Sequence, residues 1–278
     1  MRRTVVIGCG GGGCNTVSRI DPHKLKVVTI NTGSSGSEST IALASGNVPG
    51  CMGDRDLGWA LASDYKDDIK RNIEGYSNII VTAGLGGGTG AGVIPVIAEC
   101  AREYNIRLIS VVSVPMPFEV ARRERAMTQM KEILRLSDRT VLLDVGKIPD
   151  LGVSDMQIST AISSADEMMK EAIVRCSEML NGPFFSLFSE KVYTVAYSSV
   201  IDPVKAANSA MGTSMFDVDL NYGKIIVSTD GKLPKSDEEE VIKTIGDRTG
   251  IVPDVVAGNG EGQGMLLFIP MSYRSLLS

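Results

Sequence analysis

Two glycine-rich stretches carry the clearest chemical signal in this sequence. They read GCGGGGCN over residues 8–15 and GLGGGTGAG over residues 84–92, and together they hold eleven of the 30 glycines. Each follows a short apolar run and precedes a helical pattern, so its backbone N–H groups would lie at a helix N-terminus, where the helix dipole favours phosphate. The alternative, a turn that only lets a helix pack tightly on a sheet, is weaker because two such loops occur. The sequence therefore predicts two phosphate-binding loops.

Neither loop matches a common nucleotide-binding motif completely. The first has the G-x-G-x-x-G spacing of dinucleotide folds, but residues 29–33 (TINTG), which end the next predicted strand, offer no carboxylate for a ribose. The second lacks the Lys-Ser/Thr pair of a Walker loop. We therefore expect main-chain N–H groups and the Thr89 hydroxyl to hold phosphate. An NAD-binding Rossmann oxidoreductase remains an alternative to this interpretation.

Alternating strand and helix patterns supply the frame for these loops. Apolar, β-branched runs predict strands over residues 4–7, 26–29, 78–82, 107–112 and 140–143. Helical spacing of apolar residues predicts helices over residues 14–20, 57–73, 93–104, 121–136 and 154–180. Residues 33–54 are rich in Gly and Ser and indicate a long loop with one short helical piece. The alternation predicts an α/β fold with a parallel sheet covered by helices on both faces.

The pattern changes near residues 181–183 (NGP). Beyond them the sequence predicts strands over 192–197, 224–228, 255–256 and 265–269, and helices starting near 202 and spanning 236–249. We therefore expect two domains. Residues 1–181 would form a nucleotide-binding domain that includes the long central helix, and residues 182–278 would form a compact α+β domain.

Composition narrows the functional classes. The chain has 278 residues, 43% apolar and 22% charged, with a net charge of −5, which disfavours a general nucleic-acid binder. No apolar run is long enough to insert into a membrane, and the first residues lead directly into a strand, so we expect neither a signal peptide nor an export route. Five cysteines without a C-x-x-C pair indicate buried free thiols in a cytoplasmic protein. The single histidine, His23, makes a catalytic triad or a histidine-rich metal site improbable.

The second loop resembles the GGGTG signature of the tubulin/FtsZ family, and its surroundings resemble the FtsZ branch. Residues 7–15 (IGCGGGGCN) are similar to that family's first phosphate loop. Residues 50–58 (GCMGDRDLG) resemble its γ-phosphate loop, with Cys51 and Met52 where small residues are usual. Residues 117–123 (PFEVARR) resemble its ribose-binding segment, with Val120 where a glycine is common. The resemblance covers nearly the whole chain and implies the family's fold and the binding of GTP or GDP, with Mg²⁺ as a further candidate cofactor.

The resemblance also assigns roles to individual residues. The implied phosphate contacts are Gly11, Gly12, Gly13, Cys14, Asn15, Gly53, Gly86, Gly87, Gly88, Thr89 and Gly90. Glu119 and Arg123 would contact the ribose, although the same two residues also fit a surface ion pair four positions apart on a helix. Asp166 would accept hydrogen bonds from guanine N1–H and N2–H, a donor pair that adenine does not present. Its alternative is an exposed helix carboxylate.

Several positions depart from the family pattern. The resemblance implies hydrolysis in trans, in which a neighbouring chain of the polymer inserts an N-x-D-x-x-D loop. The corresponding residues 181–191 here read NGPFFSLFSEK. The aspartates are absent, and only Glu190 could polarise a water. Residues 217–219 (DVD) imitate the motif but fit a loop or helix cap better. Ile162 replaces a common aromatic ring, Val145 a common asparagine, and Gly33 an acidic residue.

These features favour an FtsZ-like guanine-nucleotide-binding protein, a divergent filament-forming or regulatory protein with weak or absent hydrolysis. One alternative is an active, assembly-dependent GTPase that uses Glu190 in trans. Another is a scaffold that binds nucleotide and one protein partner but never polymerises. Self-association as a filament or dimer is expected, whereas binding of nucleic acid and direct membrane insertion are not. Because the sequence ends at Ser278, we expect no tail of the kind that recruits membrane adaptors in FtsZ.

Overall fold

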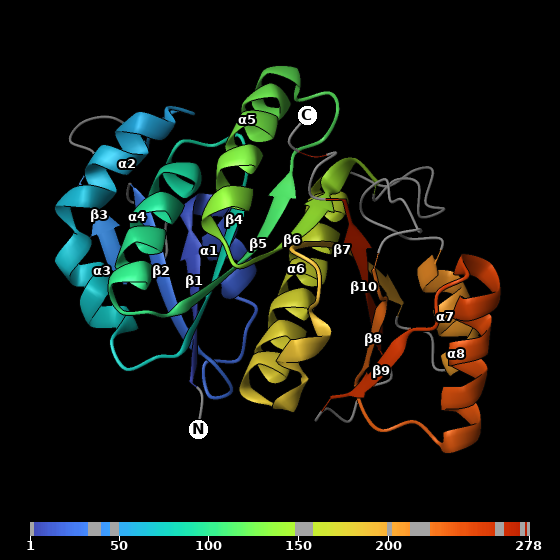
Figure 1. Cartoon of the computed structure of the whole chain (residues 1–278). Coiled ribbons are helices and arrows are strands. Elements are labelled where there is room, and N and C mark those ends of the chain that lie inside the picture. Colours follow the sequence, from blue (N-terminus) through green and yellow to red (C-terminus); the bar gives the residue numbers. More distant parts are fainter. Residues whose placement is uncertain are drawn as a thin grey trace.

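A computed structural model describes residues 3–32, 40–44, 50–147, 158–198, 202–211, 223–258, 264–272 and 276. Its strands form one sheet in the order β3-β2-β1-β4-β5-β6-β7-β10-β8-β9, with helices on both faces (Figure 1). The strands are β1 (Thr4–Cys9), β2 (Lys26–Thr32), β3 (Ile41–Leu43), β4 (Asn78–Gly84), β5 (Arg107–Val114), β6 (Arg139–Asp144), β7 (Val192–Ser198), β8 (Ile226–Thr229), β9 (Asp254–Ala257) and β10 (Met265–Met271). The helices are α1 (Gly10–Val17), α2 (Arg55–Asp64), α3 (Lys66–Ile73), α4 (Thr89–Glu103), α5 (Val120–Leu136), α6 (Ile158–Asn181), α7 (Pro203–Met211) and α8 (Lys235–Thr249), with short 3₁₀ turns η1 (Val145–Lys147) and η3 (Pro183–Leu187).

The first seven strands run parallel to one another. Their order places β1 and β4 side by side although β2 and β3 lie between them in sequence. This is the point where the direction of strand addition reverses, and in open α/β sheets ligands bind there, outside the carboxyl ends of the strands. The two glycine-rich stretches follow β1 and β4, so the predicted α/β arrangement brings both to this point.

The rest of the sheet is mixed. Strand β10 pairs antiparallel with both β7 and β8, and β9 runs parallel to β8. Because β6 pairs with β7, the sheet continues without a break across the expected boundary at residue 181. The mixed strands and α7–α8 match the expected smaller α+β part, whereas its division into a separate domain stays a prediction.

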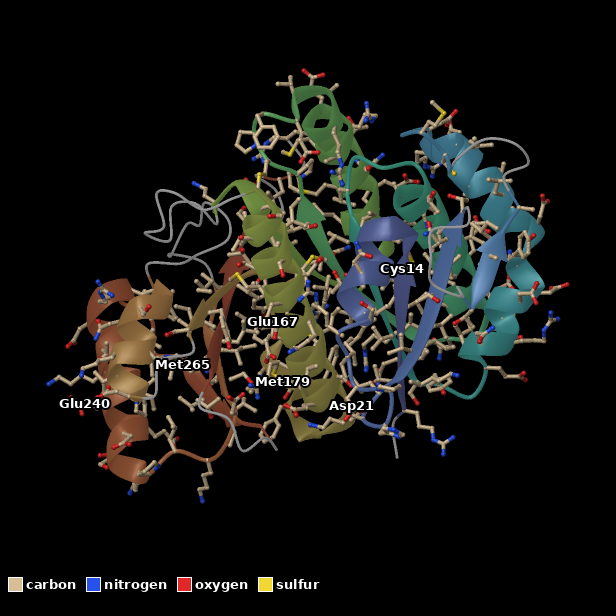
Figure 2. The ribbon with its side chains drawn as sticks, turned by 180° about the vertical axis from the view of Figure 1, so that it is seen from behind. Cys14, Asp21, Glu167, Met179, Glu240 and Met265 are labelled. Atoms are coloured by element: carbon tan, nitrogen blue, oxygen red, sulfur yellow. The ribbon has the colours of Figure 1, made fainter. Side chains whose placement is uncertain are left out.

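Side chains on each strand alternate between the two faces of the sheet. On β1, Val5 and Ile7 enter a core shared with α4 and α5, whereas Val6 enters a core shared with α6. Figure 2 shows α1 and α6 together on the second face, with Cys14 marking α1 and Glu167 marking α6. A third core lies between α7, α8 and strands β7, β8 and β10. Helix α6 thus packs along the middle of the sheet and touches elements from both halves.

Most predicted elements are present, and the differences have local causes. The predicted helix over 57–73 is wrong as a single element, because Tyr65 leaves helical geometry (φ −105°, ψ 19°) and separates α2 from α3. Within the predicted loop over 33–54, the structure describes residues 40–44 and 50–54, and these include strand β3, which the sequence did not predict. Helices α1 and α4 begin four residues earlier than predicted, at Gly10 and Thr89, because the glycines themselves form their first turns. Residues 33, 154–157 and 217–219 lie outside the described residues.

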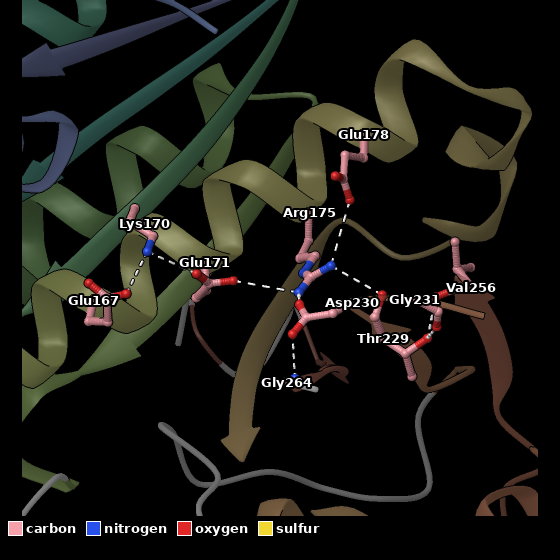
Figure 3. Close-up of polar contacts among 10 residues, drawn as sticks. All are labelled: Glu167, Lys170, Glu171, Arg175, Glu178, Thr229, Asp230, Gly231, Val256 and Gly264. Atoms are coloured by element: carbon pink, nitrogen blue, oxygen red, sulfur yellow. Dashed lines mark hydrogen bonds and ion pairs between the residues drawn. The ribbon is translucent and has the colours of Figure 1, made fainter. Parts of the chain in front are cut away.

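A buried charge cluster joins α6 to the mixed strands (Figure 3). The Arg175 side chain is 5% exposed and pairs with Asp230, while its Nη1 donates to the Thr229 carbonyl at 3.1 Å. Glu171 and Glu178, on either side of Arg175 along α6, lie 3.6 and 3.8 Å from its guanidinium nitrogens. Asp230 in turn accepts a hydrogen bond from the Gly264 N–H. These contacts attach the central helix to the ends of β8 and β10.

All five cysteines are buried free thiols and His23 is a surface residue, as the sequence predicts. Among the described residues, no three His, Cys, Asp or Glu side chains gather in a way that could hold a metal ion. In the same part of the chain, we find no helix with the length and apolar character needed to cross a membrane.

Candidate functional site

The two glycine-rich loops touch each other at the carboxyl edge of the sheet. A Cβ atom on Gly13 would stand 2.2 Å from the Thr82 carbonyl oxygen, so α1 lies directly on β4. A Cβ on Gly10 would stand 2.9 Å from the Gly90 nitrogen, and φ at Gly10 is +68°. By contrast, a Cβ on Gly11 would meet no atom within 4 Å. Glycine is therefore required for packing at positions 10 and 13, while Gly11 faces open space.

The helix N-termini at this edge have unpaired donors. The first N–H groups of an α-helix have no partner within the helix. Neither α1 nor α4 has a capping side chain at its start, and neither has an acidic residue in its first turn. Two uncapped helix dipoles thus point positive ends at the same place, which favours an anion there.

The residues of the first loop divide into an exposed group and a buried group. Gly11, Gly12 and Asn15 are exposed, whereas Gly13 and Cys14 are buried. The Cys14 sulfur lies 3.6 Å from the Gly8 carbonyl oxygen, and burial raises the pKa of this thiol to about 11. At neutral pH, Cys14 therefore offers a ligand only its main-chain N–H.

Residues 50–54 lie over the second loop. Three of them, Gly50, Met52 and Gly53, have φ of +75°, +46° and +86°, so this segment turns sharply. A Cβ on Gly88 would stand 2.4 Å from the Asp54 carbonyl oxygen, which shows how closely the segment approaches the loop. The side chain of Asp54 caps α2 by accepting two backbone hydrogen bonds at its start.

The hydroxyl of Thr89, predicted to meet phosphate, is already engaged. It lies 2.7 Å from the hydroxyl of Thr32 at the end of β2, and Thr89 is 9% exposed. One hydroxyl of such a pair donates and the other accepts, so each keeps further hydrogen-bonding capacity. The pair thereby ties β2 to the start of α4.

A cleft opens beside the first loop, between the carboxyl ends of β4 to β6 and helices α5 and α6. Its lining includes Gly12, Glu119, Arg122 and Asp166. The Glu119 carboxylate accepts a hydrogen bond from Arg122 at 2.7 Å and another from the Met116 N–H at 3.3 Å. The apolar part of the lining includes Val145 and Ile162, two of the positions that depart from the family pattern.

Asp166 stands on α6 where this helix meets α1. Its Oδ1 accepts a hydrogen bond from the Thr16 hydroxyl at 3.0 Å, and Arg19 lies 3.8 Å from Oδ2. The side chain is 14% exposed, so the alternative of a freely exposed helix carboxylate is wrong. Burial raises the pKa of Asp166, while Thr16 and Arg19 act in the opposite direction. The carboxylate retains lone pairs that face the cleft.

The alternative for Glu119 and Arg123, an ion pair between the two, is wrong. Glu119 pairs with Arg122, and Arg123 binds the buried Asp144 through two hydrogen bonds of 2.8 and 2.5 Å. Arg123 also donates to the Pro115 carbonyl oxygen at 2.5 Å. Helix α5 turns by about 100° per residue, so consecutive arginines point in different directions. Arg122 is the arginine that lies on the cleft, and the sequence pattern did not single it out.

Glu190 is not brought to the glycine loops within one chain. It precedes β7, whose first residue is Val192, and so lies at the amino edge of the parallel strands. The glycine loops lie at the carboxyl edge, about 20 Å away along a strand of six residues. The Glu190 N–H donates to the Tyr193 hydroxyl at 2.9 Å. Any joint action of Glu190 with the loops therefore needs two chains.

The structure also shows contacts that sequence reasoning missed. Gln129 and Arg125 on α5 reach the second glycine loop, and Gly86 accepts a hydrogen bond from Arg125 at 3.1 Å. Both residues look like ordinary polar positions of an amphipathic helix. The one usable signal was their spacing of four, which puts both on one face of α5.

Comparison with known proteins agrees with this architecture. Residues 20–152 match the sequence model of the Tubulin/FtsZ family, GTPase domain. The chain is 29% identical over 271 residues to cell division protein FtsZ 1 of Pyrococcus horikoshii, an alignment that covers 86% of this chain and 71% of that relative.

Two solved structures share the fold. An empty FtsZ dimer of M. jannaschii superposes with a TM-score of 0.79 at 21% identity, covering 99% of this chain and 89% of the other. A GTPγS-bound protofilament of CetZ2 from Haloferax volcanii superposes with a TM-score of 0.78 at 18% identity, covering 99% and 96%. The sequence matches, the shared fold and the paired glycine loops lead to one conclusion: this chain belongs to the tubulin/FtsZ superfamily.

Proposed function

We propose that this chain is an FtsZ-like protein that binds a guanine nucleotide at the carboxyl edge of its sheet. The observation that carries the proposal is the meeting of two uncapped, acid-free helix N-termini, those of α1 and α4, where β1 and β4 adjoin. Phosphate would bind the main-chain N–H groups of both loops, from Gly11 to Asn15 and from Gly87 to Gly90. The Gly86 N–H already donates to Gln129, so Gly86 would hold the loop in position and would not bind phosphate.

The cleft supports a place for the nucleoside. Glu119 and Arg122 would contact the ribose, while Arg123 would act indirectly by holding Asp144 and the chain before α5. Asp166 would accept the N1–H and N2–H of guanine through its free lone pairs. Adenine presents an acceptor at N1, so the same carboxylate would reject it. Ile162 would pack against the base in place of an aromatic ring.

Slow or absent hydrolysis is part of the proposal. Among the described residues at the amino edge, η3 presents Phe184 and Phe185 where acidic side chains would orient water. Phe185 also lies 3.8 Å below the Arg107 guanidinium, which holds this segment against the sheet. Mg²⁺ would arrive bound to the phosphates, because no cluster of carboxylates that could hold a metal ion by itself is present among the described residues.

The second candidate, an assembly-dependent GTPase, has one observation in its favour. Glu190 and the glycine loops lie at opposite edges of one sheet, so head-to-tail stacking of two chains would bring them together. The solved relatives include an FtsZ dimer and a CetZ2 protofilament. We therefore propose self-association as a dimer or filament in the cytoplasm, with a non-polymerising scaffold as the opposing possibility.

The nucleotide that copurifies with the protein tests the proposal most directly. The purified chain is denatured, the released nucleotide is identified by chromatography, and binding of GDP, GTP, ADP and NAD is then measured on the stripped protein. We expect guanine nucleotides to copurify and to bind at least about tenfold more tightly than ADP. NAD binding without any response to GTP would contradict the proposal and revive the oxidoreductase.

Turnover at increasing protein concentration separates the two candidates. A trans mechanism gives a GTP hydrolysis rate that rises more steeply than linearly and falls in Glu190→Gln. The control is Glu239→Gln, which removes an exposed carboxylate on α8. Our first proposal expects a low rate that Glu190→Gln does not change. Sedimentation with GTP and with GDP tests self-association, and a chain that stays monomeric with both would favour the scaffold.

A further inference from the structure

Gln129 is a buried polar side chain in an otherwise charged stretch of α5. It is 6% exposed, whereas Arg122 and Arg125 on the same face of the helix are exposed. A buried amide must satisfy both its carbonyl oxygen and its NH₂ group, since unpaired polar atoms are costly away from water. The hydrogen-bond partners of Gln129 therefore show which segment this face of α5 holds in place.

Both ends of the Gln129 amide bind the second glycine loop. Its Oε1 accepts a hydrogen bond from the Gly86 N–H at 2.6 Å, and its Nε2 donates to the Gly87 carbonyl oxygen at 3.0 Å. The side chain thus makes the kind of hydrogen bonds that a neighbouring strand would make, because it offers one acceptor and one donor to consecutive peptide groups. Both bonds lie on the side of the loop that faces α5.

The hydrogen bonds of the second glycine loop show which of its backbone N–H groups already have an acceptor in the protein. The Leu85 N–H donates to the Ser113 carbonyl oxygen at 2.8 Å, and the Gly86 N–H donates to Gln129. Within the described residues, the Gly87 and Gly88 N–H groups have no recorded acceptor. The loop therefore divides at one position: earlier N–H groups are held by protein, and later ones remain available to a ligand.

The conformation at Gly86 depends on this contact. Its φ is +82°, and a Cβ there would stand 2.2 Å from the Arg122 carbonyl oxygen, so the loop presses directly on α5. Arg125 adds a hydrogen bond to the Gly86 carbonyl oxygen at 3.1 Å. Its guanidinium also lies 3.1 Å from where a Gly53 Cβ would stand. Helix α5 thereby touches the two segments expected to surround the terminal phosphates.

We propose that Gln129 is a positioning residue for nucleotide binding, whose amide locks the Gly86–Gly87 peptides so that the N–H groups from Gly87 onward face the phosphates. The inference rests on the proposed function of the same site and deepens it. Gln129 does not touch the nucleotide. It acts through the loop, because pre-set donors lose no conformational freedom when the ligand binds.

Three variants test this role. Gln129→Leu removes both hydrogen bonds at similar volume. Gln129→Glu keeps the acceptor for Gly86 but, when ionised, places a second carboxylate oxygen against the Gly87 carbonyl. Met130→Ala is the matched control, because Met130 is fully buried on the same helix and belongs to the hydrophobic core. It weakens the packing of α5 without removing a polar contact to the loop.

Hydrogen exchange in the absence of nucleotide measures how strongly Gln129 protects the Gly86 amide. In Gln129→Leu we expect the Gly86 amide, followed by NMR, to exchange at least about tenfold faster than in the unmodified chain. In Gln129→Glu the Gly86 amide should keep its protection, because the acceptor oxygen remains. Unchanged exchange at Gly86 in Gln129→Leu would overturn the inference, whatever the chain binds.

Nucleotide affinity measures the consequence. We expect Gln129→Leu to bind GDP about tenfold or more weakly than the unmodified chain, and Met130→Ala to bind within about threefold. Equal losses in Gln129→Leu and Met130→Ala would overturn the inference and leave the proposed function standing. If the unmodified chain binds no guanine nucleotide, the proposed function fails and the inference fails with it.

The pH profile of Gln129→Glu gives a readout that general destabilisation does not produce. A protonated carboxyl group has one O–H donor and one acceptor, as the amide does, so its affinity relative to the unmodified chain should recover as the pH falls from 8 to about 5.5. The charged groups on the same surface as Gln129 are Arg55, Glu124, Arg125, Lys131, Glu132 and Arg135, and Arg122 lies against Gly86. All of these groups are the same in both proteins, so the ratio of affinities reports the group at position 129. A flat ratio would overturn the proposed donor role of the amide.

Discussion

Two polar regions contact α6, and they differ in whether their hydrogen-bonding groups have partners within the protein. At the glycine loops, backbone donors at the starts of α1 and α4 have neither capping side chains nor acidic neighbours. In the Arg175 cluster, charged side chains are withdrawn from water and paired with one another. Buried polar groups that find partners in the protein stabilise a fold, whereas exposed donors left without partners can serve a ligand.

The two regions share one helix. Asp166 faces the cleft, and Arg175 lies nine positions further along α6, about 14 Å away along the helix axis. Asp166 contacts α1 through Thr16, and Arg175 contacts β8 through Asp230 and Thr229. The comparison therefore predicts that variants in the Arg175 cluster change mainly stability, and that variants at the loops change mainly binding.

The largest effect on stability is expected from Arg175→Met. It leaves Asp230 buried without its partner, and breaking a buried ion pair in this way costs about 3–5 kcal/mol. Urea unfolding measures the loss, and the double variant Arg175→Met/Asp230→Asn should recover part of it. Lys235→Met, in an exposed pair with Glu239 on α8, is the control and should leave the unfolding curve unchanged. A loss below about 1 kcal/mol would show that the cluster does not hold α6 to the sheet.

The next largest effect is expected from a matched pair in the first loop. Gly13→Ala forces a methyl group against the Thr82 carbonyl, and overpacking of this kind costs about 1–3 kcal/mol. Gly11→Ala has open space around the new methyl group and should leave the free energy of unfolding nearly unchanged. If the loop binds phosphate, Gly11→Ala should still weaken GDP binding, as measured by titration calorimetry. Equal effects of the two variants on stability would contradict the division between packing and ligand-facing glycines.

Neighbouring arginines on α5 allow a finer comparison. Arg123→Gln removes both hydrogen bonds to the buried Asp144 and should lower the free energy of unfolding by about 2 kcal/mol. Arg122→Gln removes only a partly exposed pair with Glu119, worth about 0.5 kcal/mol or less, but should weaken nucleotide binding. Thermal unfolding and GDP titration on both variants separate the two roles. A larger stability loss in Arg122→Gln would reverse the assignment.

The smallest effect on stability is expected from Asp166→Asn. Burial raises the folded-state pKa of Asp166 above its usual 3.8, so its stabilising contribution is complete below that value and is lost as the pH rises through the raised pKa. The asparagine keeps an acceptor for Thr16, so the variant should be at least as stable as the unmodified chain at pH 7.

Guanine binding should respond to Asp166 in the opposite sense. It needs the ionised carboxylate, so affinity should fall as the pH drops through the same raised pKa, and Asp166→Asn should bind GDP at least about tenfold more weakly. Calorimetric titration with GDP and ADP from pH 8 down to about 4, near the usual pKa of the group, checks both points. An unchanged preference for GDP over ADP in Asp166→Asn would remove Asp166 from the proposed base-recognition role.

Much of the parallel part of the fold was predictable from local pattern. The β-branched runs of β1, β4, β5 and β6 are short, apolar and separated by helical periodicity, and buried parallel strands have this signature. The early starts of α1 and α4 were missed, because glycine propensity argues against helix where tertiary packing favours it. The break at Tyr65 was missed because the helical spacing of apolar residues continues from residue 57 to residue 73. Strand β3 was missed because it has only three residues.

The candidate site was predictable where it depends on backbone and not where it depends on side-chain direction. The positions of the glycine loops follow from strand order, since loops after adjacent parallel strands must meet at one edge. The roles of Arg122 and Arg123, the Gln129 contact and the burial of Arg175 depend on helix rotation and on strands distant in sequence.

The sequence by itself thus determined that two donor-rich glycine loops exist, because glycine spacing and β-branched runs act within a few residues. Tertiary structure alone decided which of the neighbouring polar side chains face those loops. It also decided that Glu190 lies at the opposite edge from them. Such contacts join residues far apart in the chain, and their partners are set by packing, which no local pattern encodes.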